Sequence, residues 1–143
     1  MDTSETYIKM CDCKEVQGKH DLETHDSLED GDFFAQEVLK DRPKGVFVFK
    51  ELCPYCGPSP GIKITWLPRQ DQIQEMMGLE DVGYLMNELM YFWQNDHLEL
   101  IDDKCLFYKQ EIDSMEHLWL AFYMHEEHKK IWTGENWIAV NNA

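Results

Sequence analysis

A nine-residue segment in the middle of the chain, residues 53–61, restricts the fold more than any other. It reads Cys-Pro-Tyr-Cys-Gly-Pro-Ser-Pro-Gly and so contains three prolines and two glycines. Because proline has no amide hydrogen to donate and glycine disfavours helix, this segment must turn. Residues 45–50 before it and residues 62–67 after it are rich in the β-branched and aromatic side chains that favour strands. The pattern predicts a β-hairpin with Cys53 and Cys56 at its tip.

Weaker strand and loop patterns fill the rest of the first half of the chain. Residues 6–10 alternate only weakly between polar and apolar side chains, and this pattern predicts an opening strand. Residues 14–32 are polar and acidic and contain two glycines, a composition typical of a loop. Residues 33–39 form a short apolar stretch.

Helical patterns begin after Pro68. A short helix is predicted at residues 72–77, where Gly78 ends it. A longer helix is predicted at residues 81–93, with three apolar side chains on one face: Leu85, Leu89 and Phe92. Residues 104–109 predict a last strand.

The clearest helix begins near Ser114. Ser114 or Asp113 can accept hydrogen bonds from the free amides of the first turn, and Glu116 can complete a capping box with Asp113. Two lysines, at positions 129 and 130, suit the negative end of the helix dipole, and Gly134 follows. Aromatic side chains lie on more than one face, so the rest of the core or a second copy of the chain must cover the helix, and a homodimer stays open.

These elements together predict one α+β domain over residues 1–143. In this domain a small antiparallel sheet with the cysteine-bearing hairpin is followed by two or three helices. A chain of 143 residues can bury a sufficient core without disulfide bonds. No apolar run approaches the roughly 20 residues that a membrane-spanning helix needs, so we expect no membrane partner.

The net charge is −15, from 28 acidic and 13 basic side chains. The excess divides along the chain as −5 in residues 1–50, −6 in 51–100 and −4 in 101–143, so no acidic tail stands apart. An acidic surface repels nucleic acid, because DNA binding depends on lysine and arginine displacing counterions. We therefore expect no direct nucleic-acid binding. The charge favours solubility. It also suits a surface that imitates nucleic acid and thereby binds a basic protein in place of nucleic acid.

The five cysteines are an odd number, and the first residues lack the basic start and apolar stretch of a secretory signal. We expect a cytoplasmic protein with reduced thiols or a metal site. Cys53 and Cys56 have the two-residue spacing of a zinc knuckle. Cys11 and Cys13 provide a second pair, so the four sulfurs together predict a structural zinc site.

Two alternatives remain open at this cysteine site. His20 or His25 can replace one cysteine as a ligand, and all the cysteines can instead be simple thiols. The Cys-Pro-Tyr-Cys sequence also resembles a glutaredoxin active site. That chemistry needs a helix directly after the first cysteine, and Pro60 with its flanking glycines opposes one. A thiol- or metal-dependent enzyme that uses Cys53 and Cys56 is nevertheless the alternative function.

A second histidine-containing motif lacks the spacing for catalysis. His125-Glu126-Glu127-His128 places its histidines three residues apart, whereas a zinc protease needs four. A solvated, charged helix end explains the motif. No phosphate-binding glycine loop, nucleophile elbow or kinase signature occurs, so we predict a protein that is not an enzyme.

Three segments carry a resemblance to a known group of proteins. They are Trp-Leu-Pro-Arg-Gln-Asp-Gln-Ile-Gln-Glu-Met at residues 66–76, Tyr-Ile-Lys-Met-Cys-Asp-Cys-Lys-Glu-Val-Gln at 7–17, and Ser-Met-Glu-His-Leu-Trp-Leu-Ala-Phe-Tyr-Met-His-Glu at 114–126. In this order they resemble small bacteriophage and prophage proteins of Gram-positive and gut bacteria, a family of unknown activity. Our leading hypothesis is a protein that binds and neutralises a host protein, and an inhibitor of a defence system fits the acidic charge. The resemblance itself implies a phage accessory protein that works in the host cytoplasm. It brings no catalytic residues with it.

Overall fold

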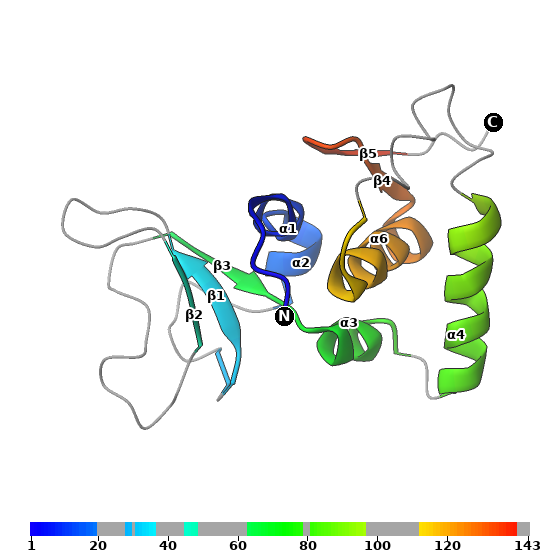
Figure 1. The fold of residues 1–143 in the computed structure, drawn as a ribbon, viewed down its shortest axis with the longest axis horizontal. Helices are drawn as coiled ribbons and strands as arrows, with labels where there is room; N and C mark the ends of the chain where they lie inside the picture. The colour runs from blue at the N-terminus through cyan, green and yellow to red at the C-terminus, as the bar shows by residue number, and fades with distance from the viewer. Residues whose placement is uncertain are drawn as a thin grey trace. The chain divides into compact units, whose positions relative to one another are not determined.

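The computed structural model describes residues 1–19, 28–29, 31–36, 45–48, 63–78, 81–96 and 112–139 (Figure 1). The chain divides into two compact units. The sheet unit is Thr3–Arg69, and the helical unit is Met1–Asp2 together with Gln70–Ala143. A small antiparallel sheet combined with several helices confirms the predicted α+β class. That the chain forms one domain stays a prediction.

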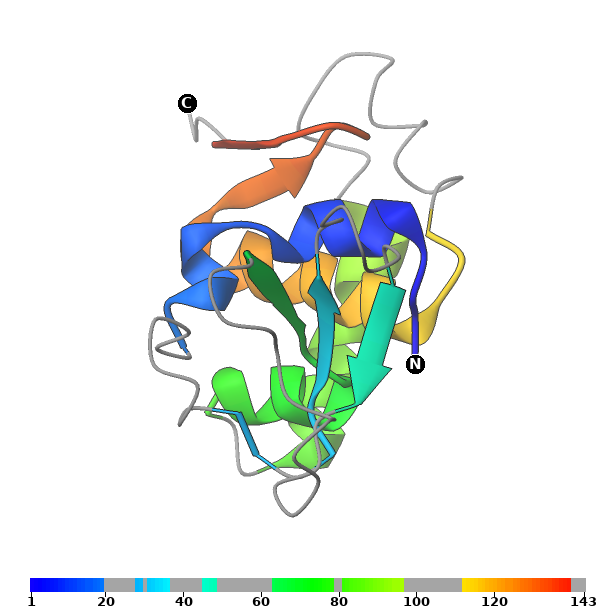
Figure 2. The same cartoon turned by 90° about the vertical axis from the view of Figure 1, so that its left-hand side faces the viewer.

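The sheet unit is built on three antiparallel strands: β1 (Phe33–Gln36), β2 (Gly45–Val48) and β3 (Ile64–Leu67). The strand order is β2-β1-β3, and Figure 2 shows β1 between the other two. The segments predicted as strands at residues 45–50 and 62–67 are therefore strands, but the predicted hairpin between them is wrong. The short apolar stretch that begins at residue 33 forms β1, which is the central strand and pairs with both β2 and β3. The residues predicted at the tip of that hairpin, 53–61, lie outside the described part of the chain.

The predicted opening strand is also wrong. Residues 5–11 form a helix, α1 (Glu5–Cys11), and the predicted loop that follows begins with a further short helix, α2 (Lys14–Gln17). Ser4 caps α1 by accepting a hydrogen bond from the amide of Tyr7 at 3.1 Å. The apolar residues at positions 7, 10 and 11 have the spacing of one helical face, and all three are buried. Five residues of weak alternation are too few to separate a strand from a helix.

One side chain protects the outer edge of β3. The amide of Gln17 donates to the carbonyl oxygen of Trp66 at 3.0 Å and accepts from the amide of the same residue at 2.9 Å. It also donates to the carbonyl oxygen of Cys11 at 2.8 Å. These are the hydrogen bonds that a neighbouring strand would make, so Gln17 satisfies part of an otherwise open sheet edge.

Two further contacts hold the end of β3. The hydroxyl of Tyr7 donates to the carbonyl oxygen of Pro68 at 2.6 Å. Arg69 donates to the carbonyl oxygen of Gly31 at 2.9 Å and lies 3.9 Å from the buried carboxylate of Asp32. Arg69 therefore has a structural role at the end of β3.

The helical unit begins with α3 (Gln70–Met76), α4 (Val82–Tyr91) and a single turn of π-helix, η2 (Phe92–Asp96). Both helices were predicted, and Gly78, with a φ of 66°, follows the end of α3. Asp81 caps α4 by accepting from the amide of Tyr84 at 3.1 Å. The predicted inward face of the second helix is confirmed, because Leu85, Leu89 and Phe92 are all buried.

The longest helix in the described part of the chain is α6 (Met115–His128). Ser114 is its cap and accepts from the amide of His117 at 3.0 Å, so the predicted capping box between Asp113 and Glu116 does not form. The helix ends one residue before the predicted lysines, since Lys129 adopts the left-handed conformation with a φ of 51°. A hairpin that was not predicted follows, with strands β4 (Lys130–Trp132) and β5 (Trp137–Ala139).

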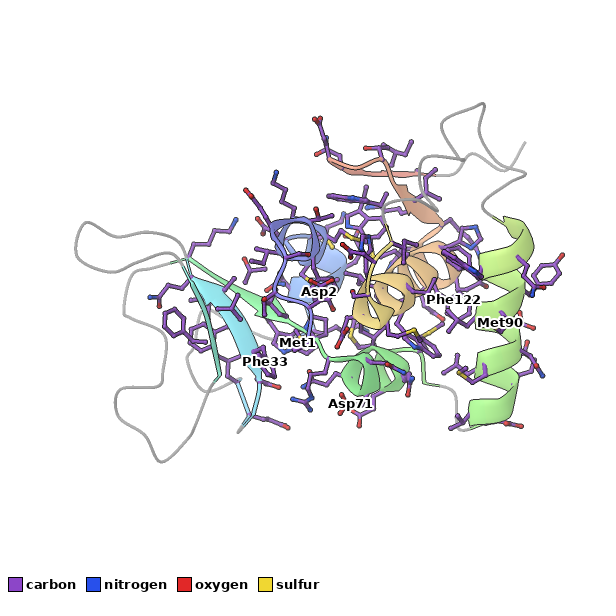
Figure 3. The ribbon with its side chains drawn as sticks, viewed as in Figure 1. Met1, Asp2, Phe33, Asp71, Met90 and Phe122 are labelled. Atoms are coloured by element: carbon purple, nitrogen blue, oxygen red, sulfur yellow. The ribbon has the colours of Figure 1, made fainter. Side chains whose placement is uncertain are left out.

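Helix α6 is the core of its unit. Apart from Leu118, every residue from His117 to Met124 is buried within a single copy of the chain, so no second copy is needed to cover it. The ring of Phe122 lies 5.5 Å from that of Phe92 and 6.0 Å from that of Trp119. Figure 3 shows Phe122 on the side of α6 that faces α4.

Two predictions about elements remain. The strand predicted at residues 104–109 lies outside the described residues. Among the helices in the described part of the chain, none combines the length and the apolar character that crossing a bilayer requires.

Candidate functional site

The predicted zinc site is only partly within the described structure. Cys53 and Cys56 lie outside the described residues, as do the alternative ligands His20 and His25. Cys11 ends α1 and is fully buried. Cys13 occupies the cap position of α2 and is half-buried. In the described ranges no group of metal-ligating side chains includes either cysteine, so the four-cysteine site stays a prediction.

The thiol of Cys13 is held in its protonated form. Burial raises its pKa from 9.0 to about 11, while a hydrogen bond with the backbone of Val16 opposes this and the Glu15 carboxylate adds to it. A thiol is nucleophilic only as thiolate, so Cys13 is not an activated nucleophile in this environment.

We expect metal-free protein to show slow alkylation of Cys13 by iodoacetamide at about pH 7.5, accelerating toward pH 11. The free energy of unfolding should fall between about pH 9 and 11, because the unfolded thiol ionises from about 9 while the folded thiol keeps its proton. Since Cys13 is only half-buried, water screens part of the effect, and the loss should stay below about 2 kcal/mol. Mass spectrometry of the peptide with Cys11 and Cys13 and urea titrations across this range provide the measurements. Cys13→Ser should remove the decline, and an alkylation rate equal to that of free cysteine contradicts the expectation.

A different group of potential metal ligands lies at the start of α6. The group consists of Asp2, Asp113 and His117, each of which contributes one potential ligand atom. These three atoms lie within 4.8 Å of one another, and the His117 side chain is 1% exposed. The Nδ1 atom of His117 is 3.7 Å from the Oδ1 atom of Asp113. Sequence reasoning missed this group because Asp2 and Asp113 are far apart in the chain.

Local structure explains the position of the Asp2 carboxylate without a cation. The hydroxyl of Ser114 donates to the Oδ2 atom of Asp2, and the amino terminus lies 3.4 Å from Glu116. Acidic groups are favoured at a helix N-terminus, where the helix dipole is positive and disfavours a metal ion. The arrangement therefore fastens the first residues of the chain to α6.

The histidines at the end of α6 have local partners. The Nδ1 atom of His125 lies 2.9 Å from the Glu126 carboxylate, and the Nε2 atom of His128 lies 3.1 Å from the hydroxyl of Tyr123. Neither histidine belongs to a metal-ligating group among the residues that the structure describes.

Helix α4 presents the most unusual surface of the described chain. Half of its ten residues are large apolar or aromatic side chains that are at least 40% exposed: Val82, Tyr84, Met86, Met90 and Tyr91. We call these five residues the α4 face. Met86 and Met90 are 40% and 46% exposed and follow Val82 at four-residue spacing, while the tyrosines are seven apart, so two stripes run along the helix.

The helical unit that carries the α4 face is strongly acidic. It contains 16 acidic and 4 basic side chains, a net charge of −12, whereas the sheet unit has 12 acidic and 9 basic side chains, a net charge of −3. The even distribution along the sequence thus becomes an uneven one between the units. Asp81 is exposed beside the α4 face, and Glu88 lies on the same helix, half-buried.

The chain was compared with protein-family models, curated proteins and solved structures. No protein-family model, curated protein or solved structure matches the chain. The resemblance to phage and prophage proteins stays a prediction.

Proposed function

We propose that this chain is a non-enzymatic interaction protein, encoded by a phage or prophage, which binds a basic host protein in the host cytoplasm. The α4 face is the observation that supports this proposal. Soluble proteins seldom leave a row of large apolar side chains in water unless the row contacts a partner. The five side chains occupy one ten-residue helix, which is about the size of a helical recognition element.

The residue types of the α4 face define the groove that would receive it. Tyrosine and methionine are enriched in the buried centres of interfaces, and methionine adapts its shape to the partner. Such a helix binds by laying its apolar face in a hydrophobic groove. The partner should therefore offer an apolar groove of about three helical turns.

The charge around the α4 face defines the rim of that groove. A unit of net charge −12 attracts lysine and arginine, so the partner's groove should be bordered by basic side chains. The same charge opposes a second copy of the chain, because two such units would bring like charges within the roughly 8 Å over which they interact. Nucleic acid is opposed for the same reason.

The basic face of a host protein commonly serves to bind nucleic acid. An acidic protein docked there would exclude the nucleic acid and inactivate the host protein. Inhibition of a nucleic-acid-binding defence enzyme is therefore the consequence that we propose for binding.

The proposal is tested by capture from a lysate of a Gram-positive host followed by binding measurements with the purified partner. We expect the wild-type chain to retain a basic protein that elevated salt releases. Replacing both Met86 and Met90 with glutamate should weaken calorimetric binding by about 100-fold, because two apolar contacts are lost and two charges enter the groove. A nucleic-acid competitor should also displace the chain.

Met115→Glu is the matched control. Met115 is exposed to the same extent as Met90, 46%, and belongs to the same unit, but it lies outside the α4 face. Its substitution should leave binding unchanged. The proposal is wrong if no protein is retained above background, if both variants bind like the wild type, or if light scattering shows that the methionines instead hold two copies together.

A further inference from the structure

A pocket of about 500 Å³ lies in the sheet unit, between the first helix and the sheet. Its lining includes Ile8 and Lys9 from α1 and residues from all three strands: Ala35 and Gln36 of β1, Gly45 and Val46 of β2, and Thr65 of β3. The volume falls within the range of about 300–1,000 Å³ that is typical of small-molecule sites. The pocket is separate from the α4 face and does not depend on the function proposed for it.

The floor of the pocket is a row of side chains across the sheet. Ala35 lies opposite Val46 on one neighbouring strand and opposite Thr65 on the other. Residues directly opposite on adjacent strands share a face, so the three form one apolar strip that includes the methyl group of the threonine. The small side chain of Ala35 leaves space at the middle of this strip.

Three charged side chains line the pocket: Glu5, Lys9 and Asp12. Asp12 accepts from the Nζ atom of Lys63 at 2.6 Å, and Glu5 has a partner within the chain. Lys9 is exposed and has no ion-pair partner among the residues that the structure describes. The pocket therefore offers an apolar floor and one cation at its rim.

We propose that this pocket binds a small amphiphilic anion. Its aromatic or aliphatic body lies on the strip formed by Val46, Ala35 and Thr65, and its carboxylate or sulfonate pairs with Lys9. Binding of an anion here is compatible with the acidity of the protein, because the sheet unit has a net charge of only −3.

The probe for this proposal is 8-anilinonaphthalene-1-sulfonate, which combines an apolar body with one anionic group. Fluorescence titration should show saturable binding of one dye per chain. The chain has four alanines, at positions 35, 121, 139 and 143, so methyl-labelled alanine gives four NMR signals. Dye should shift the signal of Ala35 and leave that of Ala121, which is buried in α6, unchanged.

Two variants and two controls locate the dye. Ala35→Leu places a larger side chain in the pocket and should weaken binding at least 10-fold, and Lys9→Glu should do the same while its exposed position spares the fold. Lys14→Glu changes an exposed lysine of the same unit outside the pocket and should have no effect. The Met86→Glu, Met90→Glu double variant should also bind normally. Binding that survives both Ala35→Leu and Lys9→Glu overturns the proposal, as does loss of binding in the α4 variant or the absence of saturable binding.

Discussion

Replacing Gln17 with leucine is expected to lower the free energy of unfolding by about 3 kcal/mol. Leucine has a similar size but neither donates nor accepts hydrogen bonds. The substitution leaves the amide and carbonyl of Trp66 and the carbonyl of Cys11 without the three bonds they now share with Gln17. Each buried polar group left unsatisfied costs about 1–3 kcal/mol, and partial access to water reduces the sum. Urea denaturation followed by circular dichroism measures the loss.

Gln74→Leu is the control for this substitution. Gln74 is half-buried on α3, and no side-chain hydrogen bond to it occurs within the described residues, so its replacement should change stability by less than about 0.5 kcal/mol. Hydrogen exchange should further show faster exchange at the amide of Trp66 in the Gln17 variant. A Gln17→Leu protein as stable as the wild type would mean that water replaces the side chain at the edge of β3.

Replacing Phe122 with alanine is expected to cost about 3–5 kcal/mol of stability. Phe122 is 1% exposed, and its ring lies against Phe92 and Trp119. The loss combines the apolar area that is no longer buried, the cavity left at the centre of the helical unit, and two aromatic contacts. Thermal and urea unfolding of the variant provide the measurement.

Tyr91→Ala serves as the comparison, because Tyr91 is aromatic but 56% exposed on α4. Its loss should lower stability by less than about 1 kcal/mol, while it should weaken partner binding if the α4 face is the docking surface. Similar destabilisation by the two substitutions would contradict the placement of Phe122 in the core and of Tyr91 in solvent.

Several elements could be predicted from local sequence because local physics determines them. Ser114 is followed by apolar residues at helical spacing, and the helix begins after it. Gly78 follows the end of α3, and the β-branched runs at β2 and β3 are strands. In each case the element is determined by residues close together in the chain: a capping residue, a glycine that ends a helix, or a periodic pattern of sufficient length.

Other features depended on residues far apart in the chain. Nothing in the runs at residues 45–50 and 62–67 indicates that β1 separates them, because pairing depends on which apolar faces can be buried together. The bonds from Gln17 to Trp66 join positions 49 residues apart. The contact of Asp2 with Ser114 spans 112 residues, so sequence reasoning could not place Asp2 near His117.

The sequence by itself determined the acidity of the chain, the long helix α6 and the two strands on either side of the proline-rich segment. Only the tertiary structure decided which apolar side chains meet solvent. The helical pattern of α4 places Leu85 and Leu89 inward. The same pattern does not tell whether Met86 and Met90 are covered, because this depends on which other segments pack against the helix. The pocket above Ala35 likewise exists because α1 and three strands meet around a small side chain. Both surfaces that carry our proposals are properties of packing, which acts between segments that the sequence keeps apart.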